Sequence, residues 1–560
     1  MPKMRKWTAI VLAATLVGAL LAGCAQKEQK EQQQEKAASN APIVMTFYSE
    51  DPSPNWAGME DEVGRVITEK TGIKLKAEFA VGDAQQKSAL IASSGTFPDL
   101  ISAKGSINKM VDAGGMRDLT DLIEEHGPNI KKLFGKEMKR LRYSLDDPSI
   151  YVIPTYSAVD NVPFKAEGGF ELQHRVVKEL GYPTIRTVKD FENAIKAYLE
   201  KHPTDENGNP NIGLSLIADD WRMYISVTNP AFYTTGGPDD GETNIDIETQ
   251  KVTYHYRRPA EKEYFRWLNH MNAEGLLDKE SFVQKSDQYK AKIASGRVLG
   301  LIDQQWGYDD GEKAIKKEGK FEHGYGHYPV TLTEETKDTS YWPTGFMAGY
   351  GVGISVDNPD PVAAIKFLDF LCSEEGQVLV NWGVEGKHYV VEDGKRIIPE
   401  DVINRKVNDA AKFQQESGIG TYINMGGRYG HGVKDSTGNY YTTEFPEQII
   451  AEYNEVEKET LAAYGVSTWI ELFPKPEEFP VRPWGAAWNI PVPSDSEVSI
   501  LQEKLKNITW KRIPQIILAA PSEFDKLWDE YMAELEKAGV ERMEQGFEKF
   551  VKDRVKLWND

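Results

Sequence analysis

The sequence predicts an α/β protein that folds as at least two lobes. Its 560 residues exceed several-fold the ~100–200 residues of a typical domain. Hydrophobic residues make up 40% and charged residues 27% of the chain, proportions typical of a globular protein and not of a disordered one. Strand-like and helix-like segments alternate over residues 43–101, a pattern that indicates a largely parallel sheet covered by helices.

The first lobe is predicted from short apolar runs separated by amphipathic segments. Strands are predicted at 43–48, 74–80 and 99–101, and helices at 59–70 and 84–93. Later in the chain, the breaks at Gly181 and Pro183 divide a helical stretch over 176–200. Further segments complete the pattern, with buried strands expected at 297–303 and 351–356, a long amphipathic helix at 361–380 and surface helices over 522–558.

The charge balance and the cysteine count exclude several classes of protein. A net charge of -21 would repel nucleic-acid phosphates and anionic lipid head groups, so nucleic acid is not an expected partner. Two cysteines, Cys24 and Cys372, are too few for a disulfide framework or a four-thiolate zinc site. Cys372 falls in the predicted helix at 361–380, and we expect it to be a free, buried thiol.

The N-terminus has the layout of an export signal. Lys3, Arg5 and Lys6 precede an uncharged stretch over 7–21, which is shorter than the ~20 residues of a membrane-spanning helix. Leu21-Ala22-Gly23-Cys24 then resembles the lipobox of bacterial lipoproteins. This resemblance implies a signal peptide at 1–23, fatty acyl chains such as palmitate on Cys24, and anchoring at the outer face of the cell membrane. The alternative is a buried cysteine that ends a core helix.

Residues 24–41 are predicted to form a flexible tether. The segment is rich in Lys, Glu and Gln and offers almost no apolar side chain to bury. It would hold the folded body away from the membrane.

Several short blocks resemble one family. They are 94–101 (Ser-Gly-Thr-Phe-Pro-Asp-Leu-Ile), 150–154 (Ile-Tyr-Val-Ile-Pro), 178–184 with Asp190-Phe191, 364–377 (Ala-Ile-Lys-Phe-Leu-Asp-Phe-Leu-Cys-Ser-Glu-Glu-Gly-Gln) and 383–389 (Gly-Val-Glu-Gly-Lys-His-Tyr). In this order they resemble the extracellular solute-binding lipoproteins, family 1 and of the large carbohydrate type, that serve ABC importers of Gram-positive bacteria.

The resemblance implies a two-lobed, periplasmic-binding-protein-like α/β fold with an interlobe ligand cleft and C-terminal helices. Such a protein holds its ligand by lobe closure and releases it to permease subunits in the membrane. We expect the first lobe to comprise 42–156 and about 298–356. The second lobe would comprise about 157–297 and 357–560.

Candidate ligand-binding residues come from loops that follow predicted strands. A sugar presents apolar C–H faces ringed by hydroxyl groups, so its site needs flat aromatic side chains beside charged or amide groups. The candidates are Glu50, Asp51, Asn55, Trp56, Ser102, Tyr156, Trp221, Tyr224, Trp306, Trp342 and Arg428. For each tryptophan a packing role in the core stays open. The resemblance makes 297–303 a strand that crosses back into the first lobe, which would place Trp306 near the hinge.

No cofactor and no metal are expected. Asp205, Asn207 and Asn209 resemble the calcium loop of some relatives, but Gly213 and Leu214 stand where those relatives place acidic ligands. The segment is therefore either a weak calcium site or a plain Asn-Gly turn, and we expect calcium to be dispensable. His323 and His327 are separated by Gly324-Tyr325-Gly326 and are predicted to be solvated in a loop.

The leading hypothesis is a surface-anchored subunit that captures oligosaccharides, plant cell-wall fragments among the candidates, and that is not an enzyme. A rival hypothesis is a secreted polysaccharide hydrolase or lyase on the same anchor. A third keeps the fold and replaces the sugar with a peptide, or makes the protein a sensory lipoprotein.

Overall fold

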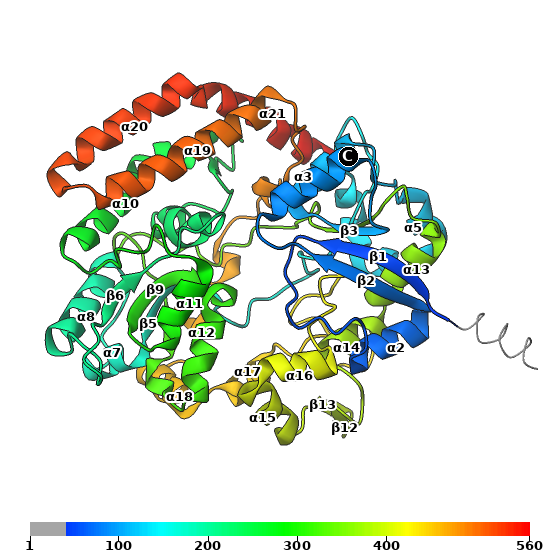
Figure 1. Cartoon of the computed structure of the whole chain (residues 1–560), viewed down its shortest axis with the longest axis horizontal. Helices are drawn as coiled ribbons and strands as arrows, with labels where there is room; N and C mark the ends of the chain where they lie inside the picture. Colours follow the sequence, from blue (N-terminus) through cyan, green and yellow to red (C-terminus); the bar gives the residue numbers. More distant parts are fainter. Residues whose placement is uncertain (1–40, 560) are drawn as a thin grey trace, which may run out of the picture.

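A computed structural model describes residues 41–559 of the chain and shows two α/β lobes side by side (Figure 1). Lobe 1 is built on a five-stranded sheet of order β2-β1-β3-β11-β4. Its strands are β1 (Ile43–Ser49), β2 (Ile73–Phe79), β3 (Leu100–Ser102), β4 (Ile153–Pro154) and β11 (Gly351–Ile354). β1 pairs in parallel with β2 and β3, whereas β11 runs antiparallel to β3 and β4.

The first helices of lobe 1 begin and end where the sequence provides caps. The Asp61 side chain accepts from Gly64 N–H at the start of α2 (Glu62–Thr71), and Gly72 ends the helix at a φ of 69°. Asp83 likewise caps the start of α3 (Ala84–Ser94), and Gly95 ends that helix. These stops set the short connections that bring the carboxyl ends of β1 and β3 next to each other.

Lobe 1 also contains a long segment that returns from the C-terminal half of the chain. Ile365, Phe367 and Leu368 of α13 (Pro361–Cys372) pack in one core with Met45 and Phe47 of β1. Ser373 ends α13 and caps α14 (Glu374–Trp382), so the predicted helix at 361–380 is two helices. The remaining elements of this lobe are α4 (Ile107–Asp112), α5 (Thr120–His126), α6 (Pro128–Phe134), β12 (Val390–Glu392), β13 (Lys395–Ile397), α15 (Glu400–Asn408) and α16 (Ala410–Ser417), and α17 (Pro446–Glu452) follows them.

Lobe 2 is built on a four-stranded sheet of order β10-β5-β9-β6. Its strands are β5 (Gly168–Gln173), β6 (Ile212–Ser215), β9 (Val298–Gln304) and β10 (Tyr325–Tyr328). β6 runs parallel to β9, and β5 is antiparallel to both β9 and β10. The other elements of lobe 2 are α7 (His174–Glu179), α8 (Val188–Lys201), α9 (Pro230–Thr234), β7 (Thr243–Ile245), β8 (Val252–Tyr254), α10 (Pro259–Ala273), α11 (Ser286–Ala294), α12 (Gln305–Lys317) and α18 (Glu455–Tyr464).

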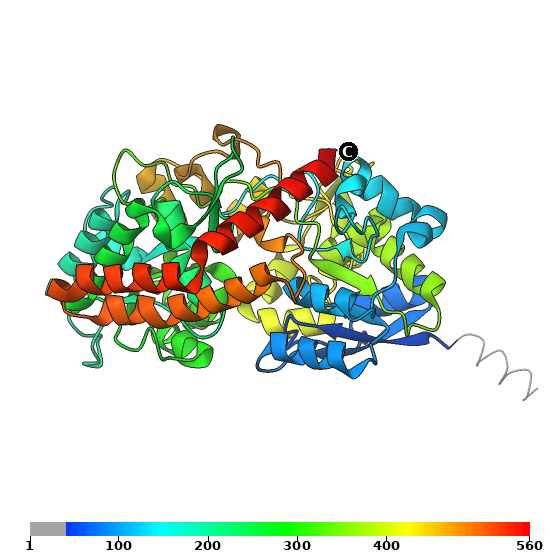
Figure 2. The ribbon, with the colours of Figure 1, turned by 90° about the horizontal axis from the view of Figure 1, so that it is seen from above.

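Three C-terminal helices complete the molecule. α19 (Glu497–Leu518) and α20 (Phe524–Ala538) pack on lobe 2 together with α10. α21 (Val540–Asn559) starts in the core of lobe 2, where Val540 and Val551 are buried, and ends in the core of lobe 1 with Leu557 and Trp558. Figure 2 shows this helix crossing from one lobe to the other.

The structure corrects the predicted lobe boundaries in two places. β9 and β10 belong to the sheet of lobe 2, although 298–356 was predicted for the first lobe. α13 and α14 join the core of lobe 1, although 357–560 was predicted for the second. A buried strand or an amphipathic helix has the same sequence pattern in either lobe, because its partner is chosen by long-range contacts.

The position of Trp306 changes with that boundary. Because β9 pairs with β5 and β6, it is not a strand that crosses back into lobe 1. Trp306 lies in the first turn of α12 and therefore on lobe 2.

The histidines His323 and His327 also differ from the prediction of a solvated loop. His327 lies in β10 and is buried, and burial lowers its pKa to about 3. His323 is half-buried and its Nδ1 donates to the carbonyl oxygen of Gly296 at 3.1 Å. Their glycine neighbours are strand and turn residues, so both rings pack against protein.

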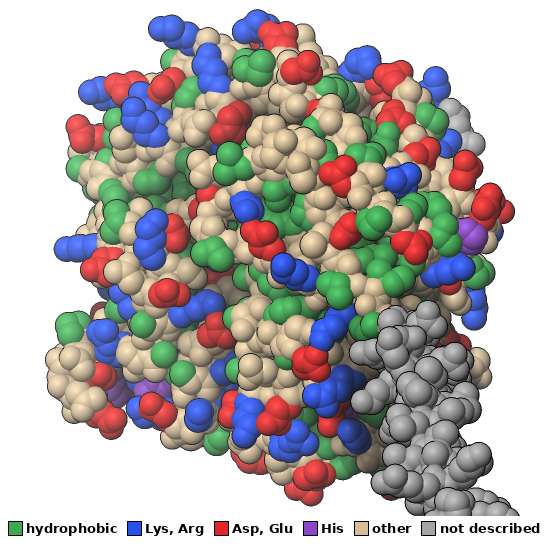
Figure 3. Space-filling view, turned by 45° about the vertical axis from the view of Figure 1, so that its right-hand side comes forward, with side chains coloured by type: hydrophobic (Ala, Val, Ile, Leu, Met, Phe, Trp, Pro, Cys, Tyr) green, Lys and Arg blue, Asp and Glu red, His purple; other side chains and the backbone are tan. Residues whose placement is uncertain are grey.

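The surface and the N-terminal region complete the description. Acidic and basic side chains are interspersed over the face shown in Figure 3. Within residues 41–559, none of the helices has the length and apolar character of a membrane span. The predicted signal peptide, the acylated Cys24 and nearly all of the predicted tether at 24–41 lie outside the described residues.

Candidate ligand-binding site

The carboxyl ends of β1 and β3 form the edge of lobe 1 that carries charged side chains. Glu50 and Asp51 directly follow β1, and the backbone N–H of Glu50 donates to the carbonyl oxygen of Ser102 at 3.0 Å. Lys104 follows β3 with a φ of 40°, and its ammonium group pairs with the carboxylate of Asp51. In a parallel pair these ends are neighbours, which is why two carboxyl groups and a lysine meet here.

Glu50 is poised to change protonation near neutral pH. Burial raises the pKa of its carboxyl group to about 7, although hydrogen bonds from Ser88 and Ser106 and the charge of Lys104 act in the opposite direction. Ser88 Oγ donates to Glu50 Oε1 at 2.5 Å. A carboxyl group in this state can donate or accept a hydrogen bond, as recognition of a sugar hydroxyl requires.

Three aromatic rings continue this edge. Tyr156 meets Tyr350 edge to face at 5.9 Å between centroids, and Tyr350 meets Trp488 at 5.1 Å. The Lys104 ammonium group lies 5.0 Å from the centroid of the Tyr156 ring. The rings come from three separate segments, one after β4, one before β11 and one far along the chain, so only the fold brings them together.

Lobe 2 contributes a pair of exposed tryptophans. Trp221 lies in the loop after β6 and Trp306 follows β9, and these strands are parallel neighbours. The two indole rings lie 5.5 Å apart with an interplanar angle of 31°, and the residues are 43% and 50% exposed. The Arg222 guanidinium lies 5.0 Å from the Trp221 ring and donates to the Asp220 carboxylate. Two large rings held side by side in solvent form a flat apolar surface that nothing in the described chain covers.

Arg428 holds the Tyr156 segment in place. Its Nη2 donates to the carbonyl oxygen of Tyr156 at 3.1 Å. Burial lowers the pKa of its guanidinium, and the charges of Glu167 and Glu444 oppose that shift. The residue therefore supports the site from behind the aromatic edge.

The other sequence candidates have packing contacts. Trp56 packs edge to face on Phe79 and Tyr422, and Tyr224 packs on Trp510. Asn55 donates to Gln414, Ser102 is buried beneath Glu50, and Trp342 stacks on Phe479 while its Nε1 donates to the carbonyl oxygen of Pro480. The structure thus groups Glu50, Asp51 and Tyr156 on one lobe and Trp221 and Trp306 on the other, and it does not gather Trp56, Tyr224 and Trp342 with either set.

Sequence reasoning missed Lys104, Tyr350 and Trp488. Tyr350 directly precedes β11 and so lies outside the polar loops that follow strands. The signals available were an aromatic residue between two glycines at 349–351 and the tryptophan-rich run at 484–488.

The Asp205 loop uses its oxygens internally. Asp205 Oδ1 accepts from the backbone N–H groups of Asn207 and Asn209, and Oδ2 accepts from the Asn209 amide. Among the residues that the structure describes, no group of three or more His, Cys, Asp or Glu is placed to hold a metal ion. The carboxylate therefore stabilises a turn.

Comparison with known proteins identifies the family. The model of the bacterial extracellular solute-binding proteins matches residues 65–381. The chain belongs to this family. A curated relative, lipoprotein LipO of Bacillus subtilis, is 22% identical over 414 residues, which cover 70% of this chain and 74% of LipO.

Other relatives are named for the sugars that they bind. The fructooligosaccharide ABC transporter substrate-binding protein FusA of Streptococcus pneumoniae is 24% identical over 243 residues, covering 40% of this chain and 43% of FusA. Its solved structure with fructo-nystose, an EF-hand mutant, has a TM-score of 0.66 at 17% identity over 91% of this chain and 99% of that one. The alginate-binding protein AlgQ2, solved without calcium ion, has a TM-score of 0.63 at 18% identity over 91% and 98% of the two chains. These structures share the two-lobed fold.

Proposed function

We propose that this family member is the solute-binding subunit of an ABC importer and that it captures oligosaccharides, including fragments of plant cell walls. The observation that carries the proposal is the exposed Trp221–Trp306 pair at the carboxyl ends of β6 and β9. Exposed, neighbouring indole rings suit the apolar C–H face of a pyranose ring. FusA and AlgQ2 are named for a fructooligosaccharide and for alginate, which agrees with a carbohydrate ligand.

The two lobes supply complementary halves of such a site. Trp221 and Trp306 would carry the flat face of one sugar, while Glu50, Asp51 and Lys104 would bind hydroxyl groups from the other lobe. Closure of the lobes would bring both halves onto the ligand and exclude water, and opening would release it to the permease subunits. None of these steps breaks a covalent bond.

A thermal-stability screen against cell-wall oligosaccharides tests the proposal. A ligand at 100 times its Kd stabilises the folded protein by about 2.7 kcal/mol, so a binder raises Tm measurably. Calorimetry of each hit then gives its Kd. Stabilisation by peptides with no response to any oligosaccharide would contradict the proposal and favour a peptide-binding protein.

The same screen separates binding from catalysis. We expect every oligosaccharide that binds to be recovered intact after prolonged incubation with pure protein. Cleavage of a glycosidic linkage, seen by chromatography, would favour the hydrolase or lyase hypothesis instead.

We also propose that the protein is anchored at the outer face of the cell membrane through acylated Cys24. The support is the lipobox at 21–24 and the similarity to a lipoprotein. Mass spectrometry of protein from cells should find a diacylglyceryl group on Cys24 and no residues before it. The Cys24→Ser variant should fold normally and be found away from the membrane.

A further inference from the structure

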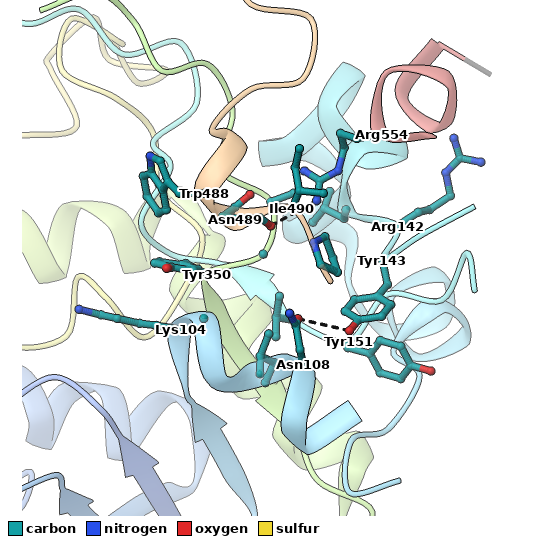
Figure 4. Close-up of a pocket in the computed structure, with 17 residues that line it drawn as sticks. Lys104, Asn108, Arg142, Tyr143, Tyr151, Tyr350, Trp488, Asn489, Ile490 and Arg554 are labelled. Carbon is teal, nitrogen blue, oxygen red and sulfur yellow. Dashed lines mark hydrogen bonds between the residues drawn. The ribbon is translucent and has the colours of Figure 1, made fainter. Parts of the chain in front are cut away.

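A small pocket lies beside the aromatic edge of lobe 1 (Figure 4). Lys104, Tyr350 and Trp488 form one side of it, and Asn108 and Tyr143 form the floor. The cavity has a volume of about 50 Å³. That is room for a few water molecules, or for one group of the size of a carboxylate or phosphate.

The charge of the lining has one sign. Three cationic side chains, Lys104, Arg142 and Arg554, line the pocket, and of the residues lining it within 41–559 none carries a carboxylate. Lys104 already pairs with Asp51, and Arg142 donates to the carbonyl oxygen of Leu557. Within residues 41–559 neither Arg142 nor Arg554 pairs with a carboxylate, and Arg554 is the more deeply buried of the two.

Arg554 is buried in an unusual way. It is 4% exposed, its Nη2 donates to the carbonyl oxygen of Asn489 at 3.3 Å, and its guanidinium lies over the Trp558 ring. Its Nη1 has no hydrogen-bond partner within the described part of the chain. Burial alone lowers its pKa to about 10.

Another buried arginine of this protein shows what Arg554 lacks. Arg482 is 3% exposed, and its Nη1 lies 2.9 Å from the Asp240 carboxylate. A buried guanidinium without such a partner is costly, because it has lost its hydration and gained no counter-charge. An anion in the pocket would supply that counter-charge.

Asn489 adds unused hydrogen-bonding groups to the same pocket. It is 7% exposed, and neither Oδ1 nor Nδ2 of its side chain has a partner in the structure over 41–559. The Tyr143 hydroxyl donates to Asn108 Oδ1 at 3.2 Å, which leaves the Asn108 amide N–H groups facing the pocket with one long contact, 3.5 Å, to Val492. Amide and guanidinium donors that converge on one small space are the elements of an oxyanion site.

We propose that this pocket binds an oxyanion, a carboxylate or phosphate group, against Arg554 and Asn489. The group can come from two sources. It can be a free anion from the medium, or an acidic substituent on the captured oligosaccharide, since Lys104, Tyr350 and Trp488 also belong to the candidate site. The second source rests on the proposed function, whereas the first does not.

The first experiment measures Tm at constant ionic strength while inorganic phosphate or acetate replaces chloride. Wild-type protein should show a saturable rise of about 1–3 °C. Arg554→Gln should show no rise. Arg542→Gln is the matched control, because Arg542 lies on the same helix, is exposed and pairs with Glu497, and it should respond like wild type. In chloride alone Arg554→Gln should be at least as stable as wild type, since an unpaired buried charge has been removed.

The second experiment compares a neutral oligosaccharide from the screen with its uronic-acid-bearing counterpart. If the glycan supplies the anion, wild-type protein should bind the acidic form about tenfold more tightly, and Arg554→Gln should bind both equally. Asn489→Leu should halve or abolish both the rise in Tm with anion and the preference for the acidic glycan. This variant replaces Arg554→Gln in the test if Arg554→Gln does not fold. A phosphate response without oligosaccharide binding would support the pocket and contradict only the proposed function.

Two results would contradict the proposal that the pocket binds an oxyanion. One is wild-type protein that responds to neither anion nor to the acidic glycan. The other is a response that Arg554→Gln and Asn489→Leu retain in full.

Discussion

The two lobes present different chemistry at the edges where their parallel strands end. The edge of lobe 1 is polar and half-buried, with Lys104 paired to Asp51 near Glu50, and Tyr156 and Tyr350 packed against each other beside them. The edge of lobe 2 is apolar and open, with Trp221 and Trp306 side by side in solvent.

This difference matches the two sides of a sugar ring. A site made of one charged half and one aromatic half gains from each side of an amphipathic ligand, and neither half alone suffices. We therefore expect substitutions in the polar half, on lobe 1, and in the aromatic half, on lobe 2, to have different effects on the protein.

The largest effect is expected from Trp306→Ala. The loss of one indole face should weaken oligosaccharide binding about 5- to 160-fold, or ~1–3 kcal/mol, as measured by calorimetry. Tm should change little because half of the residue is in solvent. Trp306→Phe should restore part of the affinity. A loss of 3–5 kcal/mol in stability, with weaker binding only through unfolding, would instead make Trp306 a core residue and break the comparison.

The polar half should respond to pH. The pKa of Glu50 is raised from 4.5 to about 7, so the folded state holds the proton more tightly than the unfolded state. The contribution of Glu50 to the free energy of unfolding is thus largest below pH 4.5, falls as pH rises to about 7 and is then constant. Urea unfolding at pH 5 and pH 7.5 should show this decline for wild type and a smaller one for Glu50→Gln.

Glu60 provides the control for that experiment. It is exposed on the same lobe, and its hydrogen bond from Lys74 lowers its pKa, so Glu60→Gln should leave the decline between pH 5 and pH 7.5 unchanged. Equal slopes for wild type and Glu50→Gln would show that Glu50 is not the titrating group.

A smaller effect is expected from a substitution at Cys372, in the core of lobe 1. Cys372 is buried, and burial raises the pKa of its thiol, so a thiol reagent should label native protein slowly. Cys372→Ala should cost about 1 kcal/mol of stability and leave ligand affinity unchanged. Rapid labelling that a bound oligosaccharide suppresses would mean that the core of lobe 1 opens with the site.

The smallest effect is expected from calcium removal. The Asp205 loop of lobe 2 satisfies its carboxylate with its own N–H groups, so a chelator should change neither Tm nor affinity. A fall of several degrees in Tm would mean that the Asp205 loop is also a functional part of lobe 2. Asp205→Ala should then reproduce that fall in Tm.

The sequence was sufficient for features that depend on local pattern. The alternation over 43–101 predicted β1, α2, β2, α3 and β3, and the loops after strands led to Glu50, Asp51, Trp221 and Trp306. Trp221 and Trp306 could be chosen because each follows a strand, but their contact required the knowledge that β6 and β9 are neighbours.

Features that depend on distant pairing were out of reach. The sheet of β9 is decided by β5 and β6, more than 80 residues before it, and its apolar sequence would suit either lobe. Trp488 meets Tyr350 across 138 positions of the chain, and no periodic pattern links them. Gly326 precedes His327 and Tyr328 follows it, and these neighbours do not indicate a buried ring. His327 is buried because its strand, β10, pairs with β5.

α21 limits the degrees of freedom that remain for ligand capture. The chain passes between the lobes in irregular segments as well, but α21 is a continuous helix of 20 residues whose hydrogen bonds fix its length at about 30 Å. Because Val551 is buried in one core and Trp558 in the other, the lobes cannot move apart along this helix without extracting a tryptophan. We therefore expect opening to be a rotation about an axis close to α21. Substitution of Leu557, which is buried in the core of lobe 1 and does not line the pocket, should alter the rate of ligand release while leaving the residues of the site untouched.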